Sequence, residues 1–478
     1  MSTLRAGLFA LALCACGSAS DRNIVGPRHV AASSGAPEIT KVVDLGDLAS
    51  LPSKGNLSAA ASDGVFVVGE LVLIEGDDFG KLPTIMIGGK PAKSLARTKA
   101  GGIVTRIPTE VAAGPIAVEV SHPEGRDTKT VEVSRFLAVA TPDAVQLATV
   151  KVDGTLALAN SLAQAGAADL CFGHDGQALY LAVPSEQSLR AVAVAAKGGA
   201  ALLPSKYRMG DGEFIELACR SGVPVIAALK RKTVLLYDAR VPTALSELAS
   251  IALPHEAVAA ALSPDGESLA VLTRDANSVL LISLKNQLVV ATLPLLGDET
   301  VPLLQDLVFA PAGDELWIVS GNSADSVVAG TRPTVLHRVA VHGISLSRIG
   351  SATIGESVGP RHLAVSQREA IMAAAAIRST AQKATLLLTS VDDGLSRLLR
   401  CDLNGKTVAV AEGEASLSRG IVSHDQKWAY AAAWSEKGMR LIYASLEEGT
   451  KNELAIPAAV PTSTASASKA TIPLSIAP

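Results

Sequence analysis

The stretch Ser263-Pro264-Asp265-Gly266-Glu267-Ser268-Leu269-Ala270-Val271 places a polar turn directly before a short apolar strand. The same order of apolar strand, polar turn and second apolar strand occurs six times along the chain. The first strands of these segments lead into their turns at Phe172, Ala218, Leu262, Phe309, Val365 and Val422. The spacings of 46, 44, 47, 56 and 57 residues match the length of a four-stranded unit. The repeat predicts an all-β fold.

Each unit has two apolar faces that it cannot bury alone, so copies arranged around an axis cover one another and remove free edges. We therefore predict a β-propeller with seven blades, and six blades as the alternative. Residues 145–150 and 155–158 are expected to form the outer strands of a closing blade that residues 470–476 complete. The alternative arises because residues 457–469 are rich in Ser, Thr and Ala and could belong to a loose tail. The stretch 263–271 resembles the turn of YVTN-type and lactonase-like propellers.

A second pattern precedes the propeller. Residues 103–107 and 116–120 alternate apolar and polar side chains, as half-buried strands do. Read in order, residues 69–80, 85–92 and 107–120 resemble an IPT/TIG domain. The resemblance implies an N-terminal immunoglobulin-like β-sandwich over residues 37–135, used as a spacer or adhesion module without catalytic residues. The β-propeller domain then covers residues 136–478.

The N-terminus has the features of an export signal. Residues 1–15 contain Arg5 followed by a ten-residue apolar stretch, which is too short to span a bilayer. The following Leu13-Cys14-Ala15-Cys16 resembles the lipobox of bacterial lipoproteins. That resemblance implies that residues 1–15 are a cleaved signal peptide, that Cys16 is lipidated, and that Gly17 directs export to the outer membrane. The alternative is an ordinary cleaved signal. Residues 16–36 are expected to form a flexible tether, and the protein would face the periplasm or the cell surface.

Composition narrows the function classes. Lys and Arg total 42 against 46 Asp and Glu, a formal net charge of −4, so nothing favours nucleic-acid binding. Beyond residue 16, no apolar stretch is long enough to cross a membrane. The odd set Cys171, Cys219 and Cys401 matches no metal or redox spacing, and we expect these residues to behave as small buried hydrophobes. No metal or cofactor is predicted.

Propellers gather ligands at the axial channel, on the face where the innermost strands begin. The positions three residues before each lead residue are Asp169, Ile215, Ala259, Asp306, His362 and Arg419. With the neighbouring Arg361, the polar members of this set form our predicted ligand-binding group: Asp169, Asp306, Arg361, His362 and Arg419. The alternative is that these side chains pair with one another and solvate a water-filled channel.

One segment of this set has a more specific pattern. The stretch Gly359-Pro360-Arg361-His362-Leu363-Ala364-Val365 resembles the GPRHLAF segment of lactonase-type propellers. If function follows, Arg361 would bind a carboxylate and His362 would shuttle a proton. Two other charged stretches have simpler readings. Residues 230–232 (Lys-Arg-Lys) are expected to be a solvated turn, and Asp211-Gly212-Glu213 lacks the ligands of a calcium loop.

These observations favour binding over catalysis. We expect a lipid-anchored envelope protein whose propeller docks a partner protein within a surface or envelope assembly. The first alternative is a glycan or small polar ligand held in the channel. The second is a lactonase-like hydrolase that uses Arg361 and His362.

Overall fold

The computed structural model describes residues 24–25, 35–45, 65–195, 198–295, 303–310, 312–321, 335–354, 370–377, 385–392, 395–413, 416–417, 420–423, 427–435, 438–446, 451–456 and 474–476. Regular structure there is almost entirely β-strand, apart from the single-turn 3-10 helices Pro184–Glu186 and Pro242–Ala244. Within these ranges, no helix has the length and apolar character that crossing a bilayer requires. The predicted all-β fold class is confirmed.

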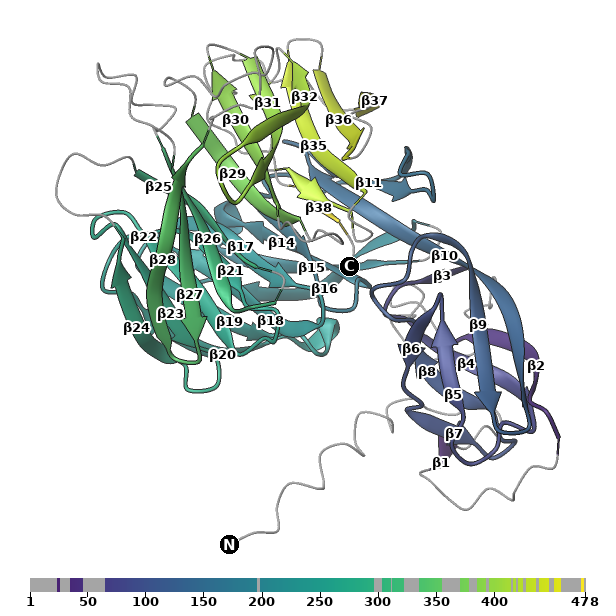
Figure 1. The fold of residues 1–478 in the computed structure, drawn as a ribbon. Coiled ribbons are helices and arrows are strands. Elements are labelled where there is room, and N and C mark those ends of the chain that lie inside the picture. The colour runs from purple at the N-terminus through teal and green to yellow at the C-terminus, as the bar shows by residue number, and fades with distance from the viewer. Residues whose placement is uncertain are drawn as a thin grey trace, which may run out of the picture.

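The N-terminal unit, defined here as residues 24–25 and the described residues between 35 and 134, contains two sheets (Figure 1). The strands of the first follow the order β1 (Ile24–Val25), β7 (Ala96–Thr98), β8 (Ile103–Arg106), β4 (Leu71–Asp77) and β2 (Glu38–Asp44). The second contains β3 (Val65–Val67), β5 (Thr84–Ile87), β6 (Lys90–Ala92), β9 (Gly114–His122) and the first part of β10 (Gly125–Ala140). In β9 the side chains of Ile116, Val118 and Val120 are buried while Ala117 between them is exposed, as the alternation predicts.

Strand β10 belongs to two sheets at once. Its first part pairs with β9 and β3, and its last part pairs with β11 (Val145–Val150) and the C-terminal strand β38 (Leu474–Ile476). Strand β12 (Leu156–Leu162) completes the order β38-β10-β11-β12, which we call the seam sheet. The expected pairing of the C-terminal stretch with this sheet is therefore observed. The sequence analysis did not foresee that β10 lies between the two predicted pieces.

Six further sheets follow in chain order among the described residues. Sheets I to V each contain four consecutive antiparallel strands, and sheet VI contains five. Sheet I comprises β13 (Asp169–Phe172), β14 (Ala178–Val183), β15 (Ser188–Val194) and β16 (Ala200–Arg208). Sheet II comprises β17 (Phe214–Arg220), β18 (Val223–Lys230), β19 (Thr233–Asp238) and β20 (Ser246–Ala252). Sheet III comprises β21 (Ala257–Leu262), β22 (Ser268–Thr273), β23 (Ser278–Ser283) and β24 (Leu288–Pro294).

The remaining sheets repeat the same meander. Sheet IV comprises β25 (Leu303–Phe309), β26 (Glu315–Gly321), β27 (Val335–His342) and β28 (Ser345–Thr353). Sheet V comprises β29 (Ala370–Ile377), β30 (Thr385–Asp392), β31 (Leu395–Asp402) and β32 (Thr407–Gly413). Sheet VI comprises β33 (Ser416–Leu417), β34 (Ile421–Val422), β35 (Trp428–Ser435), β36 (Gly438–Ser445) and β37 (Lys451–Ile456).

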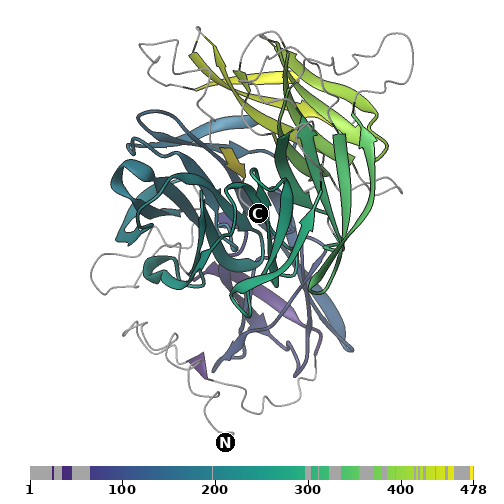
Figure 2. The ribbon, with the colours of Figure 1, turned by 90° about the vertical axis from the view of Figure 1, so that its left-hand side faces the viewer.

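The sheets surround a common centre. Each of the strands β13, β17, β21, β25 and β29 contacts the next in that order, β29 contacts β34, and β38 contacts both β34 and β13. Figures 1 and 2 show the sheets grouped around the region in which the C-terminus lies. Separate apolar clusters fill the spaces between neighbouring sheets, for example the cluster of Tyr180, Ile226 and Tyr237 between sheets I and II. This arrangement is β-propeller-like.

One of the six predicted repeats has a different register. Residues 371–373 were expected in the second strand of their unit, but residues 370–377 form the first strand of sheet V and pair with β30. The prediction was wrong because a continuous apolar run has no period that separates a first strand from a second. The segment 355–369 lies outside the described residues.

The prediction for the cysteines also needs correction. Cys171 and Cys219 form a disulfide that joins β13 of sheet I to β17 of sheet II, with a Cα–Cα distance of 6.0 Å. Only Cys401 is a free buried cysteine in the described part of the chain, and burial raises the pKa of its thiol to about 12. The sequence did not reveal the pair because the two strands become neighbours only through the packing of one sheet on the next.

The N-terminal unit packs directly against sheet I. A single apolar cluster runs from Phe66 and Val67 of the unit to Phe172 and Leu181 of the sheet. At its edge, Arg106 lies 3.9 Å from Asp175, in the turn between β13 and β14. Gly69 lies against the same turn, with a φ of +79°. The unit and the sheets therefore share one core at this junction.

A buried histidine in sheet IV predicts a pH dependence of stability. His337 is 2% exposed, its Nε2 atom lies 2.8 Å from Ser320 Oγ, and burial lowers its pKa to about 4. Between pH 6.5 and pH 4 the unfolded chain takes up a proton that the folded chain does not, so this residue reduces stability as the pH falls. By pH 4 the loss amounts to about 3 kcal/mol.

Urea unfolding of the wild type and of His337→Gln between pH 7.5 and pH 4 measures this loss, because the variant lacks the titrating group. Over that interval the free energy of unfolding of the wild type should fall by about 3 kcal/mol more than that of the variant. A constant difference between the two proteins across the interval would show that His337 does not carry the effect.

Candidate ligand site at the open face

The first strands of the sheets begin at one common edge. In sheet II, Phe214 pairs with Lys230 and Lys230 pairs with Thr233, so these strand ends lie together. In sheet III, Ala257 and Thr273 are paired in the same way. The N-terminal unit packs on the turn between β13 and β14, which lies at the opposite edge. We call the edge where the first strands begin the open face.

A pocket of about 160 Å³ lies at the open face between sheets II and III. It is lined by Glu213, Ile215, Arg231, Glu256, Ala257, Val258 and Arg274. The residues come from two kinds of segment, namely those that enter a first strand and those that join a second strand to a third. Segments of the first kind mark the face at which the sequence pattern predicts that ligands gather.

An ion-pair chain crosses the pocket. Arg231 donates one hydrogen bond to Glu213 at 3.0 Å and another to Glu256 at 2.9 Å. The hydrogen bond with Glu256 is the main cause that raises the pKa of Arg231 above its ordinary value. The guanidinium therefore joins the edges of the two sheets and remains charged.

A second set of contacts orients Glu256. Its backbone N–H donates to Asp275 Oδ1 at 2.9 Å, and His255 Nδ1 lies 3.3 Å from Asp275 Oδ2. Burial opposes ionisation of Asp275, but these hydrogen bonds outweigh it and lower the pKa of that carboxyl group. The Glu256 carbonyl also accepts a hydrogen bond from the Arg274 N–H at 2.8 Å. The backbone at Glu256 is thus held from both sides.

Arg274 differs from Arg231. Its side chain is exposed at the rim of the pocket. Within the described part of the chain it has no ion pair and no side-chain hydrogen bond. Of the four charged side chains that line the pocket, Arg274 is the one without an ion-pair partner among the described residues.

The loop that carries Glu213 rests on a buried lysine. Lys230 is 5% exposed, and its Nζ donates hydrogen bonds to the carbonyl oxygens of Met209, at 3.1 Å, and of Asp211. Burial lowers the pKa of this ammonium group, and Asp211 partly opposes the change. Gly210 and Gly212 have positive φ angles of +69° and +111°. Their backbone turns carbonyl groups toward the lysine.

Two of the predicted ligand-binding residues lie inside the ring and are engaged with the backbone. Asp169 accepts hydrogen bonds from the N–H groups of Leu170, at 2.8 Å, and of Leu217 in the neighbouring sheet, at 2.7 Å. Asp306 is 4% exposed and accepts a hydrogen bond from Leu307 N–H at 2.8 Å. Arg361, His362 and Arg419 lie outside the described residues, as does Cys16.

Ile215, the residue selected in sheet II, lies one position before the residue that corresponds to Asp169 of sheet I. Pairing between β17 and β18 shifts between Phe214 and Glu216, so Ile215 is an extra residue in the strand. Glu216 then takes the place that Asp169 has in sheet I, and its carboxylate accepts a hydrogen bond from Ala260 N–H in sheet III. Both carboxylates tie one sheet to the next.

Sequence reasoning did not identify the pocket residues. It interpreted Arg231 as part of a solvated turn and Glu213 as part of an incomplete calcium loop. A signal existed in the charge of Glu213, Arg231, Glu256 and Arg274, each beside a strand end at the same face. The pair between Arg231 and Glu256 depends on the approach of two sheets, which no local pattern specifies.

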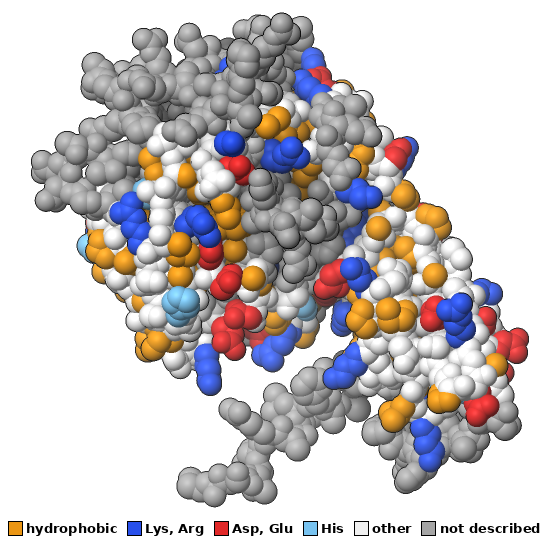
Figure 3. Space-filling view, viewed as in Figure 1, with side chains coloured by type: hydrophobic (Ala, Val, Ile, Leu, Met, Phe, Trp, Pro, Cys, Tyr) orange, Lys and Arg blue, Asp and Glu red, His pale blue; other side chains and the backbone are white. Residues whose placement is uncertain are grey.

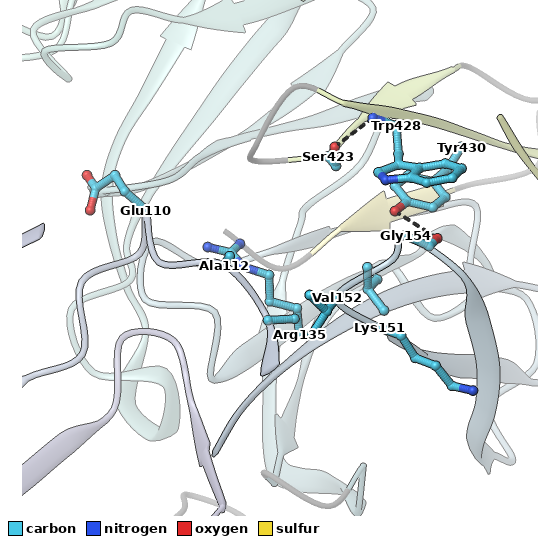
Figure 4. Close-up of a pocket in the computed structure, with 11 residues that line it drawn as sticks. Glu110, Ala112, Arg135, Lys151, Val152, Gly154, Ser423, Trp428 and Tyr430 are labelled. Atoms are coloured by element: carbon cyan, nitrogen blue, oxygen red, sulfur yellow. Dashed lines mark hydrogen bonds between the residues drawn. The ribbon is translucent and has the colours of Figure 1, made fainter. Parts of the chain in front are cut away.

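A second pocket lies where the N-terminal unit meets the seam sheet and sheet VI (Figure 4). Its volume is about 40 Å³. Arg135, 3% exposed, donates a hydrogen bond to the Val111 carbonyl at 2.8 Å, and Tyr430 donates one to the Gly154 carbonyl at 3.3 Å. The Trp428 ring lies directly over Gly154. The small volume and these internal contacts indicate a structural joint.

Surface charge gives no competing site in the view of Figure 3. On the part of that surface that the structure describes, acidic and basic side chains are interspersed. Groups of three or more His, Cys, Asp or Glu that could hold a metal ion are also absent among the described residues.

No protein-family model matches the sequence, and no curated protein matches it either. Solved structures do resemble the fold. A candidate 6-phosphogluconolactonase from Bacteroides uniformis has a TM-score of 0.52 at 13% identity, over 68% of this chain and 97% of the other. A second, from Bacteroides fragilis, has a TM-score of 0.50 at 12% identity, over 68% and 95%. A protein from Lactobacillus plantarum has a TM-score of 0.51 at 13% identity, over 72% and 99%. At these identities the likeness concerns the fold alone.

Proposed function

We propose that this chain is a small-molecule-binding β-propeller that holds its ligand in the pocket between sheets II and III. The pocket of about 160 Å³ at the open face, lined by four charged and three aliphatic residues, is the observation that carries the proposal. The open face is directed away from the N-terminal unit, so a ligand approaches without meeting that unit.

The pocket favours binding over catalysis. Its lining consists of two arginines, two glutamates and three aliphatic residues. Arg231 and both glutamates are engaged with one another, and none of the lining residues is a serine, cysteine or histidine that could act as a nucleophile or as a base near neutral pH. Groups arranged in this way orient a polar ligand.

The architecture proposed here is a seven-bladed propeller closed by the C-terminal strand. Support comes from the contacts of β38 with β13 and β34 and from its pairing with β10. The N-terminal unit is an immunoglobulin-like sandwich of the IPT/TIG type. Its two sheets and the alternation along β9 support that assignment.

The proposed location is the bacterial outer membrane, through a lipid on Cys16. The Cys171–Cys219 disulfide supports export, because such bonds persist in oxidising compartments. Docking of another envelope protein has less support. The exposed large hydrophobic residues in the described ranges come from separate places, such as Leu82 in the N-terminal unit and Ile344 in sheet IV. Isolated exposed residues of this kind do not make a docking patch.

A lactonase-like hydrolase is the second candidate. Arg361 and His362 fall between the end of β28 and the beginning of β29 in the sequence, and Thr353, the end of β28, lies at the open-face edge of sheet IV together with Leu303. The assay is hydrolysis of six-membered and five-membered sugar lactones by the wild type and by His362→Ala. Turnover that disappears in the variant would establish the enzyme, and no turnover above the uncatalysed rate would remove it.

The binding function is tested by screening sugars, amino acids and organic acids by ligand-observed NMR. Compounds that bind the wild type should bind Arg231→Met with an affinity that is lower by about tenfold or more, because that variant removes the ion-pair chain of the pocket. Arg440→Met, which breaks an exposed pair with Glu453 in sheet VI, is the matched control. Binders with equal affinity for all three proteins would place the ligand elsewhere.

A further inference from the structure

One charged side chain of the pocket has no ion-pair partner among the described residues, and the group of Glu213, Arg231 and Glu256 has a net charge of −1. Arg231 is shared between Glu213 and Glu256, whereas Arg274 has no partner of opposite charge in the described ranges. A guanidinium presents a planar fork of donors that matches a carboxylate. The pocket therefore favours a ligand with one anionic group, placed at Arg274.

The glutamates limit the total charge of that ligand. Glu213 and Glu256 both line the pocket, and their carboxylates lie within 3.0 Å of the same guanidinium. A second negative charge on the ligand would face these carboxylates at short range and be repelled. Phosphate and dicarboxylates are therefore disfavoured relative to a monoanion.

The remaining lining is aliphatic. Ala257 is buried, and Ile215 and Val258 are half-buried. Contact with the apolar part of a ligand would remove these side chains from water, which is favourable in proportion to the area covered. A volume of about 160 Å³ suits a short chain of carbon atoms better than a large sugar.

We infer that the pocket binds a short-chain aliphatic monocarboxylate, with its carboxylate on Arg274 and its apolar chain on Ile215, Ala257 and Val258. The inference rests on the proposed function and names the class of ligand. The carboxylate is selected by the guanidinium of Arg274, and a second acidic group is excluded by Glu213 and Glu256.

Calorimetric titration of the full chain with hexanoate, succinate, inorganic phosphate and glucose tests the inference. Hexanoate should bind with a saturable isotherm and more tightly than the other three probes. Arg274→Gln should weaken hexanoate binding about 10- to 100-fold, because a charged hydrogen-bonded pair is lost. Arg274→Lys keeps the charge without the fork and should give an intermediate affinity. Arg348→Gln changes an exposed residue of the outer strand β28, and this variant should bind hexanoate with the same affinity as the wild type.

Glu213→Gln provides the test of charge selection. The variant leaves the bond between Arg231 and Glu256 in place, and it should raise the affinity for succinate relative to hexanoate several-fold. An unchanged ratio would contradict the role assigned to the glutamates. Thermal melting of each variant confirms that it is folded before titration.

The outcomes separate the two proposals. Hexanoate that binds equally well to wild type and Arg274→Gln would overturn the inference, because the acid would then occupy another site. Binding of glucose or phosphate that depends on Arg231 without any binding of hexanoate would keep the proposed function and overturn the inference. Failure of every probe and of the wider screen would overturn both.

Discussion

Replacing Gly69 with alanine is expected to lower the free energy of unfolding by about 4 kcal/mol. Gly69 has a φ of +79°, and a Cβ atom there would overlap the backbone oxygen of Asp175 in sheet I. Backbone cannot move aside as the end of a flexible side chain can, so the clash adds to the strain of the left-handed conformation. The substitution should separate the N-terminal unit from the turn that it covers.

Gly222→Ala is the matched control for this prediction. Gly222 has a φ of +76°, almost the same as Gly69, but a Cβ atom there would meet nothing within 4 Å. The free energy of unfolding of Gly222→Ala should be about 1–2 kcal/mol lower than that of the wild type, which is the cost of the left-handed conformation alone. Urea unfolding of both variants measures the difference. Equal losses would mean that the junction accommodates a methyl group and is not closely packed.

Because one apolar cluster continues from the N-terminal unit into sheet I, we also expect the unit and sheet I to unfold together. The circular dichroism and tryptophan fluorescence transitions of the wild type should coincide. Trp317 and Trp428 lie in sheets IV and VI, so fluorescence follows the sheets while circular dichroism follows the whole chain. Two separated transitions would show that the N-terminal unit unfolds independently.

Removal of the Cys171–Cys219 disulfide should lower the free energy of unfolding by about 4 kcal/mol. The bond closes a loop with a sequence separation of 48 residues, and the loss of that constraint increases the entropy of the unfolded chain. The wild type in a phosphine reductant and the double variant Cys171→Ala/Cys219→Ala should both show the reduced stability. The double variant should be insensitive to the reductant.

Cys401→Ala serves as the control, since this buried thiol forms no disulfide in the described chain. Its stability should remain as sensitive to the reductant as that of the wild type. Mass spectrometry after alkylation counts the free thiols in each sample. A fully reduced wild type with undiminished stability would contradict the prediction and indicate that Asp169 and the packing of sheets I and II suffice to hold β13 against β17.

Much of the fold was predictable because its signals are local. The predicted apolar strand, the turn at 263–267 and the second apolar strand appear as β21, a turn and β22. The recurrence of this pattern at intervals of 44 to 57 residues reflects sheets that must each be covered on two faces. Prediction failed at residues 371–373 because a continuous apolar run has no alternation that identifies its place in the sheet.

The charged residues of the candidate pocket were not predicted from the sequence. The expected face was the one where first strands begin, and the pocket lies there. In sheet II the sequence pattern selected Ile215. A bulge inserts Ile215 into the strand, so Glu216 takes the register position that corresponds to Asp169. A bulge changes the face of every residue after it, and nothing in the local sequence marks this one.

Taken by itself, the sequence determined which segments form strands and turns and that they repeat, because backbone preference and burial pattern act over a few residues. The tertiary structure alone decided which charges meet and which remain without a partner. Glu213 and Arg231 come from one sheet and Glu256 and Arg274 from the next. The ion pair between Arg231 and Glu256 has a distance of 2.9 Å, which is set by the packing of one sheet on the next and not by the order of residues within either sheet.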